Sequence, residues 1–386
     1  MIVRMMPMDA PIYEPGKPIA DLQATYGLAD VVKLASNENP YGPSPRVREA
    51  LAEALQADGA EALWRYPDGA ARALRRSLAD RYGLSVEQVA IGAGADELIQ
   101  MIALRFLYGG GVSVMAETTF PMYLIATRIA GGTPRLVPMA EDGGVDLAAH
   151  AASVDEATRI VWLANPNNPT GMMFGRQAWE GFLSRVPDDV LVVLDEAYAE
   201  FVTDADYPDG PRWIARHPNV VVLRTFSKAY GLAGLRVGYA LGAPEIIAEL
   251  ERVRKPFNTS TLAQRAAAVA LTDEAHVAFV REANLKAREA LAEALLARGL
   301  RPFPSQTNFL YVPGVDGRRL AASLEPHGVI VRPAPGGVRI SVGTESENAR
   351  LLKALDALMA DPEAAAAALG ANHAADVMGA ERSHEA

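Results

Sequence analysis

The sequence predicts an α/β protein built around a mostly parallel, buried β-sheet, with a smaller α+β domain towards the C-terminus. Two observations lead to this prediction. Between residues 89 and 254, short apolar runs alternate with helical stretches, which is typical of a parallel sheet covered by helices on both faces. After residue 299 the order changes to a mixture of strands and helices, typical of a separate α+β unit.

Length, composition and charge indicate an ordinary globular protein. The chain has 386 residues, 50% hydrophobic and 22% charged, which is enough for a large core and two domains. Its net charge of −10 argues against a nucleic-acid partner. The absence of cysteine excludes disulfides, zinc–thiolate sites and cysteine nucleophiles, and we expect no metal. No apolar stretch has the length of a signal-peptide core or a membrane span, so we expect a cytoplasmic protein without a membrane partner.

The first part of the chain has few periodic patterns. We expect residues 1–32 to form an N-terminal arm. The segment 33–43 is rich in Asn, Pro and Gly and is predicted to be a loop, either a plain connection or the lining of a site. A helix is predicted to begin at Pro45 with Ser44 as its cap, and a turn at 65–69 precedes the next helix.

The middle of the chain contains the predicted sheet. Its helices are expected at 98–107, 123–129, 176–185 and 244–254. Its strands are expected at 89–91, 112–115, 136–138, 160–163, 190–194, 220–223 and 237–241.

Polar clusters follow several of these strands. They are the segments 92–97, 165–171, 195–198 and 225–236. The first is a glycine turn leading into a helix, which fits either an anion-binding cradle or an ordinary capped helix. Because ligands of such sheets bind outside the carboxyl ends of the strands, we expect the clusters to converge on one crevice.

The C-terminal part is predicted to begin with helix over 258–299, where one long helix would lead into the second domain. Strands at 309–312 and 338–342 and helices at 318–324 and 345–359 would form that domain. The predicted organisation is an arm at 1–32, a large domain at 33–258, an interdomain helix and small domain at 259–360, and a tail at 361–386. The small domain also receives part of the N-terminal segment, and the tail is expected to be frayed helix or disordered.

The segment 225–236, TFSKAYGLAGLR, carries the chemistry. It places Lys228 among hydroxyl residues just after a predicted buried strand. A lysine with a lowered pKa is a nucleophile that can form an imine, and hydroxyls together with Arg236 suit a phosphate group. Pyridoxal phosphate (PLP) needs both features, whereas the plain alternative is a surface turn with a solvated lysine.

Other clusters contain the groups that PLP chemistry requires. A buried carboxylate keeps the ring nitrogen protonated, and Asp195 has the right type and place, although it could also cap a helix or pair with a core cation. Asn168 and Tyr198 are candidate donors to the phenolate oxygen, although Asn168 could simply shape a turn. Phe120 is a candidate to pack on the ring, or an ordinary core residue.

The phosphate and the substrate need further partners. Candidates for the phosphate are Ala95, Asp96, Thr225, Ser227 and Arg236. Lys228 would hold the cofactor and then move a proton between carbon atoms. Arg339 is the leading candidate to bind a substrate carboxylate.

A series of motifs carries a resemblance to a known family. They are ASNENPYGPSP, RYPDG, GAGADE, NPNNPTG, LDEAYAEF, TFSKAYGLAGLRVGY, PSQTNFLYV and VRISVG. In this order they resemble the PLP-dependent fold-type I aminotransferases, most closely the histidinol-phosphate aminotransferase family, from about residue 13 to residue 358. The resemblance implies a seven-stranded, mostly parallel sheet flanked by helices, a smaller α+β domain, and a ping-pong transfer of an amino group.

The resemblance also implies roles for the cofactor-binding residues. Lys228 matches the lysine that holds the cofactor, Asp195 the partner of the ring nitrogen, and Phe120 the stacking ring. Asn168 and Tyr198 match contacts to the phenolate oxygen. The phosphate group matches Ala95, Asp96, Thr225, Ser227 and Arg236.

Further roles concern the neighbouring subunit and the substrate. Tyr66 matches a tyrosine that reaches the cofactor phosphate of the neighbouring subunit, so the resemblance implies a homodimer with shared sites. Asn37 and Arg339 match contacts to the carboxylate or to one end of the substrate. Tyr13 and Arg332 match positions near the distal end of the substrate.

The substrate has three interpretations. The family implies histidinol phosphate as amino donor and 2-oxoglutarate as acceptor, while aromatic amino acid aminotransferases share nearly all the motifs. Related PLP-dependent decarboxylases that act on an amino-acid phosphate share most of them. The chain departs from the family in two places: the family typically has a longer loop between Arg332 and Arg339, and Thr118 stands where the stacking motif usually begins with proline.

Overall fold

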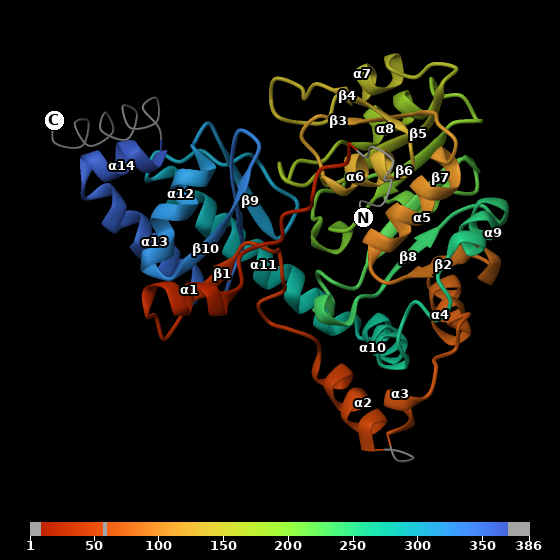
Figure 1. Ribbon diagram of the computed structural model, residues 1–386, viewed down its shortest axis with the longest axis horizontal. Coiled ribbons are helices and arrows are strands. Elements are labelled where there is room, and N and C mark those ends of the chain that lie inside the picture. Colours follow the sequence, from red (N-terminus) through yellow and green to blue (C-terminus); the bar gives the residue numbers. More distant parts are fainter. Residues whose placement is uncertain (1–8, 57–59, 370–386) are drawn as a thin grey trace, which may run out of the picture.

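A computed structural model describes residues 9–56 and 60–369. It contains a large unit around a seven-stranded sheet and a small unit around a four-stranded sheet. Helix α11 (Glu274–Leu296) runs between them (Figure 1). The predicted α/β fold, with a mostly parallel large sheet and a smaller α+β unit, is confirmed.

The large sheet has the strand order β2-β8-β7-β6-β5-β3-β4. Its members are β2 (Val89–Gly92), β3 (Val112–Ala116), β4 (Thr133–Val137), β5 (Thr158–Ala164), β6 (Leu191–Asp195), β7 (Val220–Thr225) and β8 (Gly238–Leu241). Strand β8 is antiparallel to both of its neighbours, and the remaining pairs are parallel. The other strands therefore end at the same edge.

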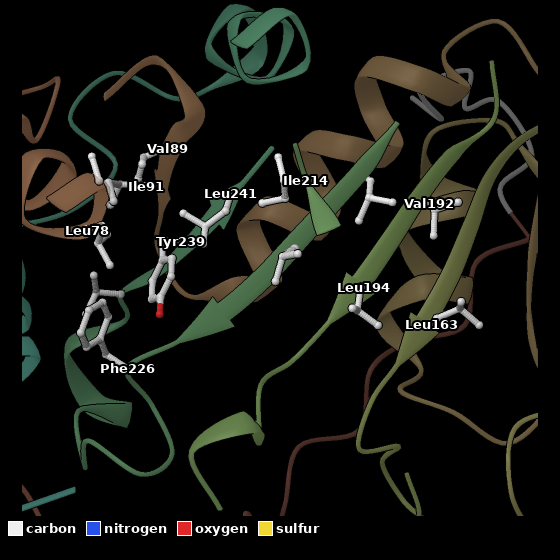
Figure 2. Close-up of a cluster of buried hydrophobic side chains, with 14 of the residues drawn as sticks. Leu78, Val89, Ile91, Leu163, Val192, Leu194, Ile214, Phe226, Tyr239 and Leu241 are labelled. Carbon is white, nitrogen blue, oxygen red and sulfur yellow. The ribbon is translucent and has the colours of Figure 1, made fainter. Parts of the chain in front are cut away.

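Both faces of this sheet are buried. On β6, Val192 and Leu194 pack on one face, while Leu191 and Val193 pack on the other. The first face, part of which is shown in Figure 2, is covered by α4 (Arg72–Tyr82), α7 (Leu147–Ala152), α8 (Arg176–Leu183) and α10 (Thr261–Thr272). The second is covered by α5 (Ala95–Leu107), α6 (Met122–Ile129) and α9 (Pro244–Val253). Burial on both faces explains why the strands are continuous apolar runs.

The small sheet has the order β1-β10-β11-β9. Its strands are β1 (Val32–Leu34), β9 (Phe309–Pro313), β10 (Val329–Ala334) and β11 (Gly337–Ser341). It packs with α1 (Ile19–Tyr26), α12 (Gly317–Leu324), α13 (Glu345–Met359) and α14 (Pro362–Leu369). Helices α2 (Pro45–Gln56) and α3 (Glu61–Trp64) extend from the large unit at the bottom of Figure 1.

Two predicted segments differ from the structure. The single long helix expected over 258–299 is wrong, because Asp273 ends α10 and its side chain caps α11 by accepting a hydrogen bond from the His276 amide. The tail that we expected to be frayed or disordered begins with α14, whose Ala368 and Leu369 are buried in the small-unit core. The rest of that tail, 370–386, lies outside the described residues.

The N-terminal arm is more regular than its sequence indicates. It contains α1, and β1 pairs in parallel with β10 through Val32 and Val329. Strand β1 is too short for a periodic signal, and its partner lies almost 300 residues away. Within the described residues, no helix combines the length and apolar composition needed to cross a bilayer. The cytoplasmic location stays a prediction.

The short segment between Arg332 and Arg339 is a tight hairpin. Strands β10 and β11 are antiparallel, with Arg332 opposite Arg339 and Ala334 opposite Gly337. Pro335 and Gly336 form the turn. Proline supplies the fixed negative φ of the first turn position, and Gly336 adopts a φ of 71°, which glycine does without steric cost.

This hairpin packs closely on the start of α12. A Cβ atom added to Gly317 would lie 1.9 Å from the Gly337 carbonyl oxygen. We expect Gly317→Ala to lower the free energy of unfolding by ~1–3 kcal/mol, because backbone has to move, as measured by urea denaturation. The control Gly181→Ala, inside α8 with no atom within 4 Å, should stabilise by ~0.5–1 kcal/mol. Equal stability of the two variants would contradict this packing argument.

Candidate active site

One cavity of about 390 Å³ lies at the carboxyl edge of the large sheet and is lined from both units. The predicted site residues around it are Tyr13, Asn37, Ala95, Asp96, Phe120, Asn168, Asp195, Tyr198, Thr225, Ser227, Lys228, Arg236, Arg332 and Arg339. Tyr66 does not line it. Residues far apart in the chain thus meet here because successive strands end at this edge.

Lys228 follows β7 and projects into the cavity. Its Nζ donates to the Ser36 carbonyl oxygen at 3.1 Å and lies 5.9 Å from the centre of the Tyr198 ring. Burial, assisted by the positive charges of Arg339 and Arg236, lowers the pKa of Lys228 to about 8. A lysine of this pKa is a better nucleophile and proton carrier near neutral pH than a solvated lysine.

Asp195 is the last residue of β6 and is 6% exposed. Burial raises the pKa of its carboxyl to about 6, opposed by hydrogen bonds from Tyr123 and the Ala197 amide. Tyr123 Oη donates to Oδ2 at 2.7 Å and Ala197 N donates to Oδ1 at 3.1 Å. The carboxylate is therefore ionised at neutral pH although it is buried.

An anion cradle forms where α5 begins. Gly94 has a φ of 82°, and a Cβ atom there would lie 2.4 Å from Arg236 Nη2. Glycine therefore lets the guanidinium approach the helix N-terminus, which has no side-chain cap. Arg236 Nη1 also donates to Ser227 Oγ at 3.4 Å. The positive end of the helix dipole, the guanidinium and the hydroxyl together suit a phosphate.

Asp96 is the acidic member of this cradle. Its Oδ1 is buried without a hydrogen-bond partner, while Oδ2 accepts weakly from Gln100 at 3.4 Å. Burial raises the pKa of Asp96, and the charge of Arg236 opposes this. Thr225 Oγ1 accepts from the Ser227 amide at 3.1 Å and thereby shapes the turn before Lys228.

Tyr198 is tied to the small unit through Asn37. Asn37 Nδ2 donates to Tyr198 Oη at 2.8 Å, and Ser341 Oγ donates to Asn37 Oδ1 at 2.8 Å. Asn37 adopts a φ of 55°, a conformation that asparagine tolerates better than most residues. Burial raises the pKa of Tyr198 to about 12, so its hydroxyl stays protonated at neutral pH.

Arg339 is a partly buried cation without a carboxylate partner within the described part of the chain. It donates to Asn168 Oδ1 and to the Ala35 carbonyl oxygen, both at 2.6 Å, and Nε is unpaired. Burial lowers its pKa, but an arginine remains charged in proteins. Because a buried charge without a counter-ion is costly, this position favours binding of an anion. The Asn168 Nδ2 group has no partner among the described residues.

Tyr13 and Arg332 form the outer end of the cavity. Arg332 Nη2 donates to the Glu14 carbonyl oxygen at 2.6 Å, and its guanidinium lies 6.0 Å from the Tyr13 ring centre. Lys17, further along the arm, pairs with Glu325 at 2.7 Å. The N-terminal arm is thus held across this end by contacts with the small unit.

Two aromatic predictions have different outcomes. Phe120 lines the cavity and meets Tyr123 edge-on, with ring centres 5.8 Å apart at 82°. Tyr66 is 81% exposed and stacks on Phe257 at 4.6 Å. A single chain therefore does not bring Tyr66 to the cavity.

Sequence reasoning missed Tyr123, Thr119 and Glu38, which also line the cavity. Tyr123 could have been found from its place three residues after Phe120 at the start of a helix, a spacing that puts two side chains on one face. Thr119 Oγ1 donates to Asn167 Oδ1 at 2.8 Å. Glu38 pairs with Lys33 at 3.3 Å and gives no comparable signal in the sequence.

Comparison with known proteins agrees with this geometry. The family model described as aminotransferase class I and II matches residues 29–355. The chain belongs to this family. It is 45% identical over 359 residues to histidinol-phosphate aminotransferase of Geobacillus thermodenitrificans, covering 92% of this chain and 97% of that protein. The resemblance drawn from the motifs is confirmed.

Solved structures place this aminotransferase among the same relatives. Histidinol-phosphate aminotransferase from Sinorhizobium meliloti, solved in complex with pyridoxal-5'-phosphate, has a TM-score of 0.81 and 31% identity, covering 89% of this chain and 96% of that one. L-threonine-O-3-phosphate decarboxylase from Porphyromonas gingivalis has a TM-score of 0.74 and 25% identity, covering 86% and 100%. The likeness to the decarboxylase is thus weaker.

The buried amine of Lys228 should reduce the stability of the protein free of small molecules. Its folded pKa of about 8 lies below the ordinary value of 10.5, so the unfolded chain binds more protons between these values and stability rises with pH there. We expect Lys228→Met to raise the free energy of unfolding by ~1–2 kcal/mol at pH 7, with little gain at pH 10.5.

Urea denaturation of the dialysed proteins at both pH values measures this effect. The control is Lys286→Met, an exposed lysine paired with Glu282, which should change stability by less than ~0.5 kcal/mol. A gain for Lys228→Met that stays constant from pH 7 to pH 10.5 would show that it does not come from the amine's charge.

Proposed function

We propose that this chain is a PLP-dependent aminotransferase that moves the amino group of histidinol phosphate to 2-oxoglutarate in a ping-pong reaction. The observation that carries the proposal is the buried amine of Lys228, which shares one cavity with the buried carboxylate of Asp195 and an anion cradle. The family match and the 45% identical relative support it. PLP, when bound, supplies an electron sink for the substrate.

The cradle fits the phosphate group of this cofactor. The space kept by Gly94 brings Arg236 to the uncapped start of α5. Backbone N–H groups of Ala95 and Asp96 and the hydroxyls of Thr225 and Ser227 would complete the binding of the phosphate oxygens. Helix N–H groups, a hydroxyl and a guanidinium are the donors that phosphate prefers.

The ring would lie between Phe120 and the end of β6. Asp195 would hold a proton on the ring nitrogen, because an ionised carboxylate in a buried site favours a cationic neighbour. Asn168 Nδ2 and Tyr198 Oη are the free donors for the phenolate oxygen. The high pKa of Tyr198 keeps that hydroxyl a donor.

Lys228 and Arg339 would act on the substrate. Lys228 would hold the cofactor covalently and, once released, carry a proton to or from the substrate carbon, for which a pKa of about 8 is well matched to neutral pH. Arg339 would bind the carboxylate of the amino acid or oxo acid, exchanging its bond with Asn168 for a charged one. Asn37 would contact the substrate at the same end as Arg339.

The outer end of the cavity supports a substrate with a distal anion. Arg332 and Tyr13 lie there, beside the hairpin residues Pro333–Pro335. Histidinol phosphate carries such an anion, and its aminotransferases are the relatives at 45% identity. An aromatic amino acid aminotransferase is the second candidate, because the segment between Arg332 and Arg339, which borders the cavity, is shorter than is typical of the histidinol-phosphate family. The decarboxylase alternative is less favoured because a histidinol-phosphate aminotransferase is 45% identical to this chain, whereas the decarboxylase is 25% identical.

Visible absorption tests whether the protein binds PLP through Lys228. The purified protein with PLP should show a visible band that Lys228→Ala lacks, because the band requires the covalent bond to the amine. A protein that never takes up PLP would overturn the proposal.

Single-turnover spectra with histidinol phosphate, phenylalanine, tyrosine and glutamate should then show the fastest change with histidinol phosphate. An aromatic amino acid in first place would favour the second candidate. Release of carbon dioxide in place of an oxo acid would favour the decarboxylase.

The exposed position of Tyr66 supports a homodimer. Tyr66 lies beside other exposed apolar side chains, Leu63, Trp64 and Phe257, and such a patch is typical of a protein–protein interface. A second copy covering it would bring Tyr66 towards the partner's cradle. The active sites would then be shared between subunits.

Subunit mixing tests this arrangement. Lys228→Ala and Tyr66→Ala homodimers should each have low activity. A mixture refolded together should regain about a quarter of the wild-type activity, because half of the dimers are hybrids with one intact site each. Mixing two Lys228→Ala preparations is the control. No recovery in hybrids shown to form by mass spectrometry would exclude a shared site.

A further inference from the structure

We propose that Tyr123 is a positioning residue that fixes the Asp195 carboxylate for the ring nitrogen of PLP. The inference rests on the proposed function. Tyr123 itself would act through Asp195.

Packing fixes the Tyr123 ring in one orientation. The side chain is fully buried at the start of α6. It stacks on Trp162 of β5 with ring centres 5.2 Å apart and planes 6° apart, and it meets Phe120 edge-on. The two aromatic contacts hold the side chain in one rotamer, so the hydroxyl is directed at Asp195 Oδ2.

The two oxygens of Asp195 have one protein donor each. Tyr123 Oη serves Oδ2, and the Ala197 amide serves Oδ1. A carboxylate oxygen accepts about two hydrogen bonds, so lone pairs remain for a protonated ring nitrogen. Without the Tyr123 hydroxyl, only the amide on Oδ1 would hold the plane of the carboxylate.

The same bond compensates for burial of the charge. Three charged or titratable groups face Asp195. The charge of Lys228 favours the ionised carboxylate, whereas negative charge on Glu196 or Tyr198 disfavours it. The hydrogen bond from Tyr123 is the strongest effect opposing burial at this carboxyl. Burial and Asp195 raise the pKa of Tyr123 well above its usual range, so its hydroxyl remains a donor at neutral pH.

Tyr123→Phe removes the hydroxyl and keeps the stacked ring. The matched control is Tyr239→Phe, because Tyr239 is also fully buried, shares a 2.7 Å hydroxyl bond with Tyr82, and packs on the opposite face of the sheet. We expect Tyr123→Phe to weaken PLP binding to the cofactor-free protein about tenfold, as expected for loss of a hydrogen bond to a charged group. Tyr239→Phe should bind PLP like the wild type.

An analogue separates positioning from packing. In the analogue of PLP with carbon in place of the ring nitrogen, the partner of Asp195 is absent. Wild type and Tyr123→Phe should therefore bind this analogue equally. A persistent tenfold difference would mean that Tyr123 only supports the shape of the pocket, and the inference would be wrong.

The pH dependence gives a second readout. The wild-type carboxyl has a pKa of about 6, and losing the Tyr123 bond raises it. The pH below which PLP affinity falls should therefore move upward in Tyr123→Phe and stay in place in Tyr239→Phe. Identical PLP affinity in wild type and Tyr123→Phe at every pH would refute the inference while leaving the proposed function intact. Failure of the wild type to bind PLP would instead refute the proposed function.

Discussion

The site depends on two opposite charges held at the ends of fully buried strands. Asp195 ends β6 and Lys228 follows β7, and both line the cavity. Burial alone would neutralise both groups, so each needs neighbours that set its protonation. Asp195 receives two hydrogen bonds. Lys228 donates to one carbonyl oxygen, and burial with the charges of Arg339 and Arg236 outweighs those of Glu38 and Asp195, so the pKa of its amine is lowered.

The neighbouring acid, Glu196, has only a minor effect on the protonation of Asp195. Glu196 follows Asp195 directly, but its carboxylate pairs with Arg224 on the other side of the strand at 2.8 Å, and both side chains are buried. A strand places successive side chains on opposite faces. The two adjacent acids therefore have different partners. Glu196 forms an ion pair with Arg224 in the core, whereas the Asp195 carboxylate faces the cavity.

Much of this arrangement was accessible from the sequence, because local patterns carry it. Apolar runs identified the strands of the large sheet, and residues placed just after them, such as Lys228 and Asp195, line the cavity. What was missed depends on distant contacts. Strand β1 exists through pairing with β10, and the hydrogen bond of Tyr123 to Asp195 is visible only once α6 is placed over β5. The interruption between α10 and α11 at Asp273 is hard to predict from the sequence. A single aspartate within an alanine-rich helical pattern can cap a new helix, but it can equally lie on the exposed face of one continuous helix.

The hairpin adds a constraint that the residue spacing alone did not reveal. Directly opposed residues of antiparallel strands lie on the same face, so Arg332 and Arg339 are like charges on one side of a two-strand ribbon. Their repulsion is part of why the pKa of Arg339 is lowered, after burial. An anion bound between or beside them relieves this repulsion, and the tight turn at Pro335 and Gly336 prevents the strands from moving apart instead. The register of the hairpin therefore places two like charges beside the cavity, an arrangement that favours binding of an anion there.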